Sequence, residues 1–365
     1  MIKSLKVENF RCFKAIEATG LQRINVLVGK NATGKTALLE AVRLAVGGTP
    51  TVLWGLNPSR GYFGGVPQPM TRDIFESLWN SYFFNFDSST SIFTDCSDSN
   101  DKHSTLRVSY DARTSEGAIA SQPAAPQQQA APTIVPTSFI PRLAFERSGF
   151  PGTATLYATA LLQGGLNFDQ GPELGPVTEF IQSSAMGVNY NPNLTTQLFS
   201  QLSLQQRESK VVAAVRDEFE HSLDSLVVLS PTGGQPALYA SLGYLKEKLP
   251  VTYLSAGIGR FIAMLSAVLL RRKGIVLIDE IENGLSYKSF TALWKYLLAF
   301  ATENDTQIFV STHSAEFVRD LLPAMEGHEN DFTLLRAERV NGSSGIEVID
   351  GKLLEAAIDQ GVEVR

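Results

Sequence analysis

The chain has 365 residues, of which 44% are hydrophobic, and a formal net charge of -6. The length fits one large or two ordinary domains, and the negative charge gives no overall electrostatic footprint for nucleic acid. Cys12 and Cys96 are too few for a zinc framework. No apolar run is long enough to span a bilayer, and residues 1–6 lack the pattern of a signal peptide. We therefore expect a cytoplasmic protein with no membrane partner.

Three strands are predicted in the first 28 residues. Spaced apolar residues mark the first two, over residues 2–10 and 13–18. The third, residues 24–28, is a near-continuous apolar run, which is typical of a strand buried on both faces.

The third strand leads into a glycine-rich loop and a helix. Residues 29–36 fit the pattern G-x-x-x-x-G-K-[ST]. Glycine lets such a loop turn its backbone N–H groups toward phosphates without a Cβ in the way, and the helix N-terminus favours anions. Lys35 would reach the β- and γ-phosphates, and the Thr36 hydroxyl would ligate Mg²⁺. The residues that we expect to bind the phosphates are Gly29, Asn31, Ala32, Thr33, Gly34, Lys35, Thr36 and Ala37.

Arg11 lies between the first two strands, flanked by Phe10 and Phe13. One interpretation is that this arginine and its aromatic neighbours stack on the adenine of the nucleotide. The other is that the two phenylalanines belong to the core and Arg11 is a surface charge. The sequence leaves both open, so Arg11 is a candidate nucleotide-binding residue.

The chain then alternates between weak elements and loops. Residues 47–68 are rich in glycine and proline, residues 73–84 predict a helix, and residues 91–111 predict strands and a turn. Residues 115–132 are of low complexity and poor in core residues, which predicts a mobile surface loop. A short strand is expected over residues 137–142.

We divide the chain into three regions. Residues 1–145 would form an N-terminal lobe, residues 146–225 a helical insertion, and residues 226–365 a C-terminal lobe. Apolar residues recur at helical spacing over 198–226, but no heptad persists, so a long coiled coil is not expected. Residues 226–240 have the pattern of a hairpin.

Ser255 and Gly257 stand where an apolar helix begins. A hydroxyl and exposed N–H groups at that place can bind a phosphate. An ordinary helix N-cap is the alternative, and it is the simpler interpretation when this segment is taken alone.

Two further buried strands end in polar residues. Residues 274–278 are followed by Asp279 and Glu280, the Walker B pattern, in which the first acid holds the water shell of Mg²⁺ and the second polarises the attacking water. The alternative is a pair of acids that cap the next helix. Residues 307–311 lead to His313, whose imidazole could hydrogen-bond the γ-phosphate.

The order of these motifs resembles the ABC-type ATPase heads of the RecF, SMC and OLD (overcoming lysogenization defect) group. The resemblance rests on residues 9–13, 29–36, 254–260, 277–285 and 311–314. It is strongest to stand-alone ATPases related to OLD proteins. It implies an α/β P-loop NTPase fold with an N-terminal β subdomain and an inserted helical subdomain. ATP, as the nucleotide, follows from the resemblance alone.

The resemblance also implies a mechanism. Two heads of such a homodimer, or of a higher oligomer, sandwich two ATP molecules, so each phosphate loop faces the partner's Ser255 and the partner's Gly257. ATP binding closes the dimer and hydrolysis opens it, which would control an effector such as a nuclease in antiphage defence or DNA repair. Nucleic acid is a possible activating ligand. A glutamine that senses Mg²⁺ is common in the class, and Gln68 is one candidate.

The sequence departs from the family pattern in three places. Ala256 and Ile258 stand where the familiar ABC signature has glycine and glutamine, and Ser286 stands where many relatives have histidine. No Toprim nuclease domain is expected after His313, which places the effector in another chain.

Two other functions remain open. One is the nucleotide-binding subunit of a transporter, although the segment between the phosphate loop and Asp279 is longer than such subunits need. The other is a scaffold that binds ATP without turnover, although a scaffold has no need of Glu280.

Overall fold

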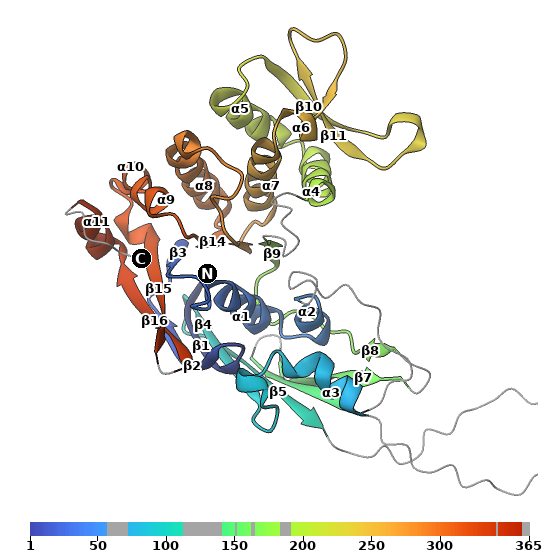
Figure 1. Ribbon diagram of the computed structural model, residues 1–365, viewed down its shortest axis with the longest axis vertical. Coiled ribbons are helices and arrows are strands. Elements are labelled where there is room, and N and C mark those ends of the chain that lie inside the picture. The colour runs from blue at the N-terminus through green and yellow to red at the C-terminus, as the bar shows by residue number, and fades with distance from the viewer. Residues whose placement is uncertain are drawn as a thin grey trace, which may run out of the picture.

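The computed structural model describes residues 1–56, 72–111, 141–149, 152–161, 165–182, 191–340 and 342–359. In this part of the chain two large sheets and one small sheet are packed with helices between and outside them (Figure 1). Gln68, the low-complexity segment 115–132 and most of the strand expected over 137–142 lie outside the described residues.

A six-stranded sheet forms the centre of the molecule. Its order is β16-β15-β3-β14-β13-β9, and every pair is parallel except β15 with β16. The strands are β3 (Ile24–Val28), β9 (Thr178–Ile181), β13 (Ile275–Ile278), β14 (Gln307–Ser311), β15 (Phe332–Val340) and β16 (Ser343–Asp350). Every residue of β3, β13 and β14 is buried, as their largely apolar sequences predict.

A seven-stranded antiparallel sheet lies beside the central one. Its order is β2-β1-β4-β5-β6-β7-β8. The strands are β1 (Ile2–Phe10), β2 (Phe13–Thr19), β4 (Ile92–Asp98), β5 (His103–Asp111), β6 (Arg142–Ser148), β7 (Ala154–Ala160) and β8 (Leu166–Phe168). The strands expected over 2–18 and 91–111 are confirmed.

Helix α1 (Lys35–Gly47) packs between the two large sheets. One hydrophobic core joins its Leu38 and Val42 to Val7 and Leu106 of the antiparallel sheet and to Leu277 of the central sheet. The helix that follows the phosphate loop is therefore held from both sides.

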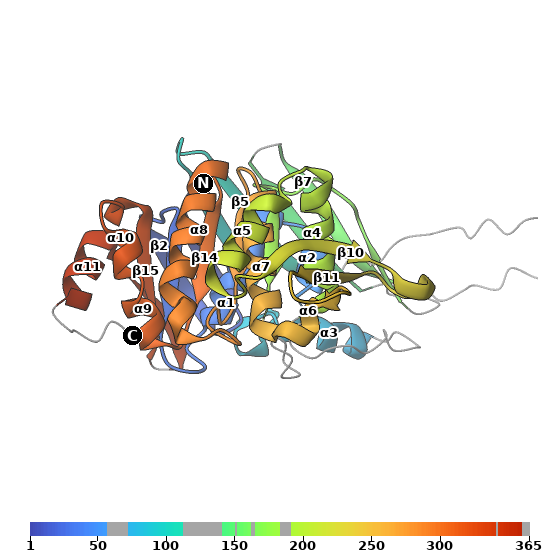
Figure 2. The same cartoon turned by 90° about the horizontal axis from the view of Figure 1, so that it is seen from above.

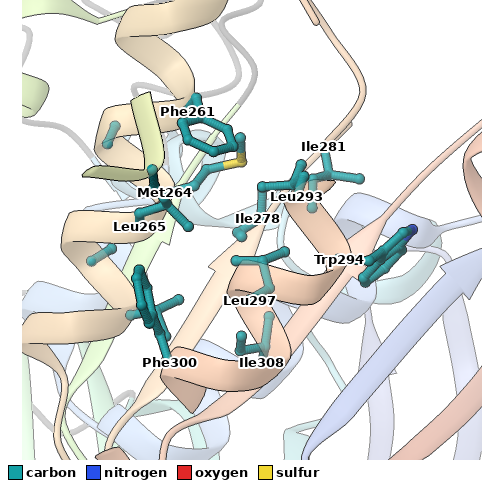
Figure 3. Packing of buried hydrophobic residues seen from close by; sticks show 14 of the residues in the cluster. Phe261, Met264, Leu265, Ile278, Ile281, Leu293, Trp294, Leu297, Phe300 and Ile308 are labelled. Atoms are coloured by element: carbon teal, nitrogen blue, oxygen red, sulfur yellow. The ribbon is translucent and has the colours of Figure 1, made fainter. Parts of the chain in front are cut away.

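The other face of the central sheet is covered by helices. The covering elements are α4 (Pro192–Leu204), α5 (Glu208–Glu218), α7 (Ala256–Leu270) and α8 (Phe290–Asn304), with the small sheet β10 (Leu223–Leu229), β11 (Ala237–Leu242) and β12 (Leu249–Pro250) and helix α6 (Val251–Leu254) beyond them. Seen from above, these helices lie next to one another (Figure 2). Phe261 of α7 and Leu297 of α8 meet Ile278 and Ile308 of the sheet in a second core (Figure 3).

The remaining described elements are short and lie around this framework. They are α2 (Pro50–Trp54), α3 (Arg72–Asn80), the 3-10 turns η2 (Phe84–Phe86), η3 (Pro231–Gly233), η4 (Tyr287–Ser289) and η5 (Glu329–Asp331), and the helices α9 (Ala315–Arg319), α10 (Leu322–Met325) and α11 (Gly351–Asp359).

The structure corrects the helical character that we expected for all of residues 146–225. The described residues of the first half form β6, β7, β8 and β9, and the helices α4 and α5 begin only at Pro192. β6 to β8 extend the antiparallel sheet, and β9 completes the edge of the central sheet beside β13. Gly and Pro clusters broke the strand pattern of this region, so local periodicity did not reveal it. The division of the chain into three regions itself stays a prediction.

Candidate functional site

The phosphate loop joins β3 to α1 with two glycines in the left-handed region of backbone conformation. Gly29 has φ +140° and Gly34 has φ +106°. A Cβ on Gly29 would lie 2.3 Å from the carbonyl oxygen of Ala337 on the neighbouring strand β15. Only glycine therefore lets the loop turn this close to the sheet.

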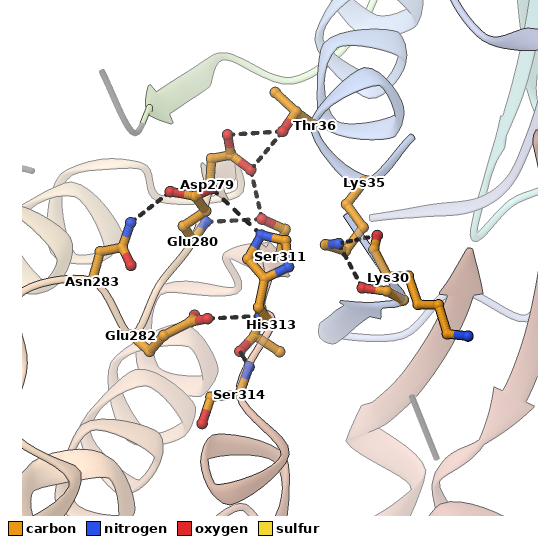
Figure 4. Close-up of polar contacts among 12 residues, drawn as sticks. Lys30, Lys35, Thr36, Asp279, Glu280, Glu282, Asn283, Ser311, His313 and Ser314 are labelled. Atoms are coloured by element: carbon orange, nitrogen blue, oxygen red, sulfur yellow. Dashed lines mark hydrogen bonds and ion pairs between the residues drawn. The ribbon is translucent and has the colours of Figure 1, made fainter. Parts of the chain in front are cut away.

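Lys35 is buried at the first turn of α1, with 5% of its surface exposed. Its ammonium donates hydrogen bonds to the carbonyls of Gly29 (2.7 Å) and Lys30 (2.9 Å), as Figure 4 shows. Burial lowers the pKa of Lys35, and the negative charges of Asp279, Glu282 and Glu280 oppose that shift. A buried cation surrounded by loop backbone suits a polyanionic ligand.

Thr36 and Asp279 meet at the carboxyl end of β13. The Thr36 hydroxyl donates to the Asp279 carboxylate at 3.0 and 3.1 Å, and the Ser311 hydroxyl donates to the same carboxylate at 2.5 Å. Mg²⁺ prefers oxygen ligands and keeps part of its water shell. The donor set therefore fits the magnesium ligands expected from the sequence, Thr36 and Asp279.

Glu280 and His313 face each other across the ends of β13 and β14. Glu280 Oε1 lies 3.4 Å from His313 Nε2, and Glu280 Oε2 accepts a bond from Asn283 at 2.5 Å (Figure 4). The Glu280 backbone has φ +48°, and its N–H donates to Ser311 Oγ at 2.8 Å. Glu280 thus holds a strained backbone conformation that aims its carboxylate toward His313.

A second acid fixes the backbone of the histidine loop. The His313 N–H donates to Glu282 Oε1 at 2.7 Å. Sequence analysis gave Glu282 no role. Its position two residues after Glu280 was the only feature of the sequence that could have indicated a role at the site.

Ser255 is the N-cap of α7. Its hydroxyl accepts a bond from the Gly257 N–H at 3.0 Å, so the local geometry is that of an ordinary N-cap. Ser255 is exposed, while Gly257 is buried so tightly that a Cβ there would lie 2.2 Å from the Gly284 carbonyl oxygen. Neither residue is among those that line the cavity at the phosphate loop.

Arg260 connects the same helix to the Walker B acids. Arg260 is only 2% exposed, and its guanidinium donates hydrogen bonds to the carbonyls of Asp279 (2.6 Å) and Glu280 (2.9 Å). The signature segment, residues 254–260, is therefore hydrogen-bonded to the end of β13, which carries both acids. The sequence did not reveal this link.

Arg11 contacts one residue of α1 and one residue of the segment after α3. Its Nε pairs with the fully buried Glu40 at 2.9 Å, and its guanidinium lies 4.3 Å from the centre of the Tyr82 ring. Phe10 and Phe13 are buried in the core. The structure places the two phenylalanines as the core interpretation predicts, and it places Arg11 at the wall of the cavity.

A cavity of about 680 Å³ opens at the phosphate loop, a size within the usual range for ligand sites. Most of the predicted residues line it: Arg11, Asn31, Ala32, Gly34, Lys35, Thr36, Ala37, Glu280 and His313. Gly29, Thr33 and Asp279 belong to the surrounding loop and strand end. Several other residues that line the cavity have no role that the sequence motifs predict, among them Phe84, Asn85, Phe86 and Arg339. The sequences of the turn 84–86 and of the hairpin that contains Arg339 hold no signal that these segments lie near the phosphate loop.

Gln182 follows β9 directly, at the level where Asp279 follows β13. Ile181 pairs with Ile278, and the Asp279 N–H donates to the Ile181 carbonyl at 2.9 Å. Within the described residues, Gln182 Nε2 is buried without a hydrogen-bond partner. Gln182 therefore stands at a strand end beside Asp279, and a short apolar strand that ends in glutamine was its only sequence signal.

The fold and the site together define a P-loop ATPase with the ABC-type order of motifs, and the expected fold class is confirmed. A family model described as "AAA ATPase domain" matches residues 1–115, and one described as "AAA domain, putative AbiEii toxin, Type IV TA system" matches residues 245–319. The two matches include the phosphate loop and the Walker B acids respectively.

Individual relatives agree with this class. The chain is 24% identical over 343 residues to an "ATP/GTP phosphatase" of Helicobacter pylori, covering 88% of this chain and 87% of that one. It is 48% identical over 46 residues to the "DNA double-strand break repair Rad50 ATPase" of Methanopyrus kandleri, or 13% of this chain and 5% of that one.

Solved structures similar to this chain include two SMC heads. An SMC head bound to the C-terminal winged-helix domain of ScpA has a TM-score of 0.49 at 12% identity, covering 98% of this chain and 99% of that one. The SMC head domain of Thermotoga maritima has a TM-score of 0.45 at 12% identity, covering 96% and 99%.

Proposed function

We propose that this protein hydrolyses ATP in a Mg²⁺-dependent reaction at the phosphate-loop cavity. The observation that carries the proposal is the meeting of groups from distant parts of the sequence: Lys35, Thr36 beside Asp279, and Glu280 beside His313. The similarity to the Helicobacter pylori protein, which is named an ATP/GTP phosphatase, supports hydrolysis.

Each residue has a distinct task in this reaction. Lys35 and the loop N–H groups bind the β- and γ-phosphates, while Thr36 and Asp279 would hold Mg²⁺, which when bound neutralises charge on the phosphates. Glu280 orients a water and accepts its proton. Asn283 and His313 fix the two carboxylate oxygens of Glu280, so the base is already oriented before substrate arrives.

We further propose that the reaction is completed by a second copy of the chain. Ser255 is exposed and is not among the residues that line the cavity, and the exposed residues Tyr253 (76%) and Tyr287 (62%) belong to segments beside it. Exposed aromatic residues are common in protein interfaces. A head-to-head homodimer would bring the Ser255 face of one copy to the phosphate loop of the other.

The output of the switch would pass to a partner protein. ATP would favour the closed dimer because ATP binds that state with higher affinity, and hydrolysis of ATP would let the dimer open. An effector such as a nuclease, in antiphage defence or DNA repair, is the partner that the resemblance to the RecF, SMC and OLD group suggests. Cytoplasmic residence and the OLD-related grouping are part of the same proposal. Within the described residues, no helix is both long and apolar enough to cross a membrane.

Steady-state phosphate release tests the proposed activity. Glu280→Gln should bind Mg-ATP normally but lower the rate of phosphate release by about 10²-fold or more, the usual contribution of a general base. Lys35→Ala should abolish ATP binding itself. Normal turnover by Glu280→Gln, or tight ATP binding by Lys35→Ala, would show that the chemistry lies elsewhere.

A further inference from the structure

An exposed aromatic turn forms one wall of the phosphate-loop cavity. η2 contributes Phe84, Asn85 and Phe86 to the lining, and Phe86 is 71% exposed, among the most exposed large apolar residues described. Apolar surface in water is unfavourable, and ligand cavities are lined predominantly by apolar and aromatic side chains. In Figure 1 this segment follows α3 (cyan), below α1.

The backbone of the turn is strained at the same residues. Asn85 has φ +53° and Phe86 has φ +60°, both in the left-handed region. A bulky residue rarely adopts this conformation, because its Cβ approaches the following carbonyl oxygen. Strain of this kind persists only where surrounding contacts enforce it, and it concentrates at ligand sites.

The enforcing contacts come from the end of β1 and from the segment between β1 and β2. Asn9 Nδ2 donates to the Thr90 carbonyl at 2.5 Å, after Phe86 in the chain. Arg11 donates from its backbone N–H to the Tyr82 carbonyl at 2.7 Å and from Nη1 to the Ser81 carbonyl at 3.1 Å, before Phe86 in the chain. The turn is therefore fastened on both sides, and Phe86 is presented to the cavity by a fixed loop.

The position of the turn relative to the phosphate-binding groups suggests its ligand. Lys35 and Thr36 occupy the part of the cavity at the N-terminus of α1, whereas Phe86 comes from the loop after α3. A nucleoside triphosphate has one anionic end and one flat aromatic end. An aromatic ring is a suitable partner for the flat end, because base and ring stack through their faces.

We propose that Phe86 is the platform on which the purine base of the nucleotide stacks. This inference rests on the proposed function, since it concerns the same cavity. It assigns base recognition to the turn 84–86 and leaves Arg11 as part of the loop's support. Because every purine offers the same face, the platform acts on ATP and GTP alike.

Calorimetric titration of the full chain with Mg-ATP, Mg-GTP and inorganic tripolyphosphate tests the platform. Phe86→Ala should weaken ATP and GTP binding by a similar factor of about ten, equivalent to about 1.4 kcal/mol, and leave tripolyphosphate binding unchanged. Phe86→Trp should restore ATP binding. Leu204→Ala, which removes an 84% exposed side chain of α4 outside the cavity, is the matched control and should change nothing.

The outcomes separate this inference from the activity it rests on. Unchanged ATP affinity in Phe86→Ala would overturn the platform. If the wild-type chain binds ATP and Lys35→Ala does not, the proposed activity would still stand in that case. An equal loss for tripolyphosphate would also overturn the platform, because Phe86 would then act on the phosphate loop. A wild-type chain that binds none of the three ligands would overturn both.

Discussion

Lys35 and Arg260 are buried cations on two sides of the acidic pair Asp279 and Glu280. Burial lowers the pKa of both cations, and the nearby carboxylates oppose the shift. Removing one acid by truncation would leave desolvated charge uncompensated and would disturb the whole cluster. Glu280→Gln also removes one negative charge, but it keeps the size of the side chain and an oxygen that can accept the hydrogen bond from Asn283, so it disturbs the structure less than truncation.

Cys96 gives a prediction of pH dependence. Burial raises the pKa of its thiol from 9.0 to about 12. Between these values the unfolded chain binds fewer protons than the folded chain, so this thiol's contribution makes the free energy of unfolding fall as pH rises. Urea unfolding at about pH 8 and about pH 10 should show a stability advantage of wild type over Cys96→Ala that narrows at the higher pH. A constant difference would contradict the assignment.

Gly257 gives a prediction for the junction of two elements, the start of α7 and the segment after the Walker B acids. Gly257→Ala would place a Cβ 2.2 Å from the Gly284 carbonyl oxygen, so it should lower the free energy of unfolding by about 1–3 kcal/mol. Gly345→Ala, where no atom lies within 4 Å of the new Cβ, is the matched control. Equal unfolding midpoints for the two variants would refute the contact.

The pairing of β5 with β6 predicts the effect of a deletion. Asp111 pairs with Arg142 at the end of the two strands, and their side chains form an ion pair at 2.7 Å. Chain ends this close need only a short connection. Removing residues 115–132 should therefore leave a folded, ATP-binding protein, as judged by circular dichroism and calorimetry. An insoluble product would show that the segment has a structural role.

The sequence predicted those features that depend on residues close together in the chain, and it missed those that depend on contacts between distant segments. The phosphate loop and the Walker B acids carry their chemistry in a short contiguous pattern, and the structure brings Lys35, Thr36 and Asp279 together as expected. β7 to β9 and the position of Phe86 depend on pairing with distant strands and loops, which local periodicity does not encode. Gln182 became recognisable only through the register of β9 on β13.

At the scale of the whole molecule, the proposed dimer makes a prediction about solution mass. Glu280→Gln should be a monomer without nucleotide and a dimer with Mg-ATP, because blocked hydrolysis keeps the closed state populated. The double variant Glu280→Gln with Ser255→Arg should bind ATP but remain monomeric. The larger arginine side chain would block the contact proposed between Ser255 and the phosphate loop of the second copy. Light scattering measures both. An ATP-induced dimer that forms equally well in the double variant would exclude this face.

The strand order of the central sheet has a consequence for how the chain folds. β3, which carries the phosphate loop, is encoded far upstream of both its neighbours, β14 and β15. Pairing between distant segments must close long loops before it gains stability, so a fold of this connectivity forms slowly. During synthesis β3 stays without its partners until β14 and β15 have been made, so over that interval it is an apolar segment that needs protection from aggregation.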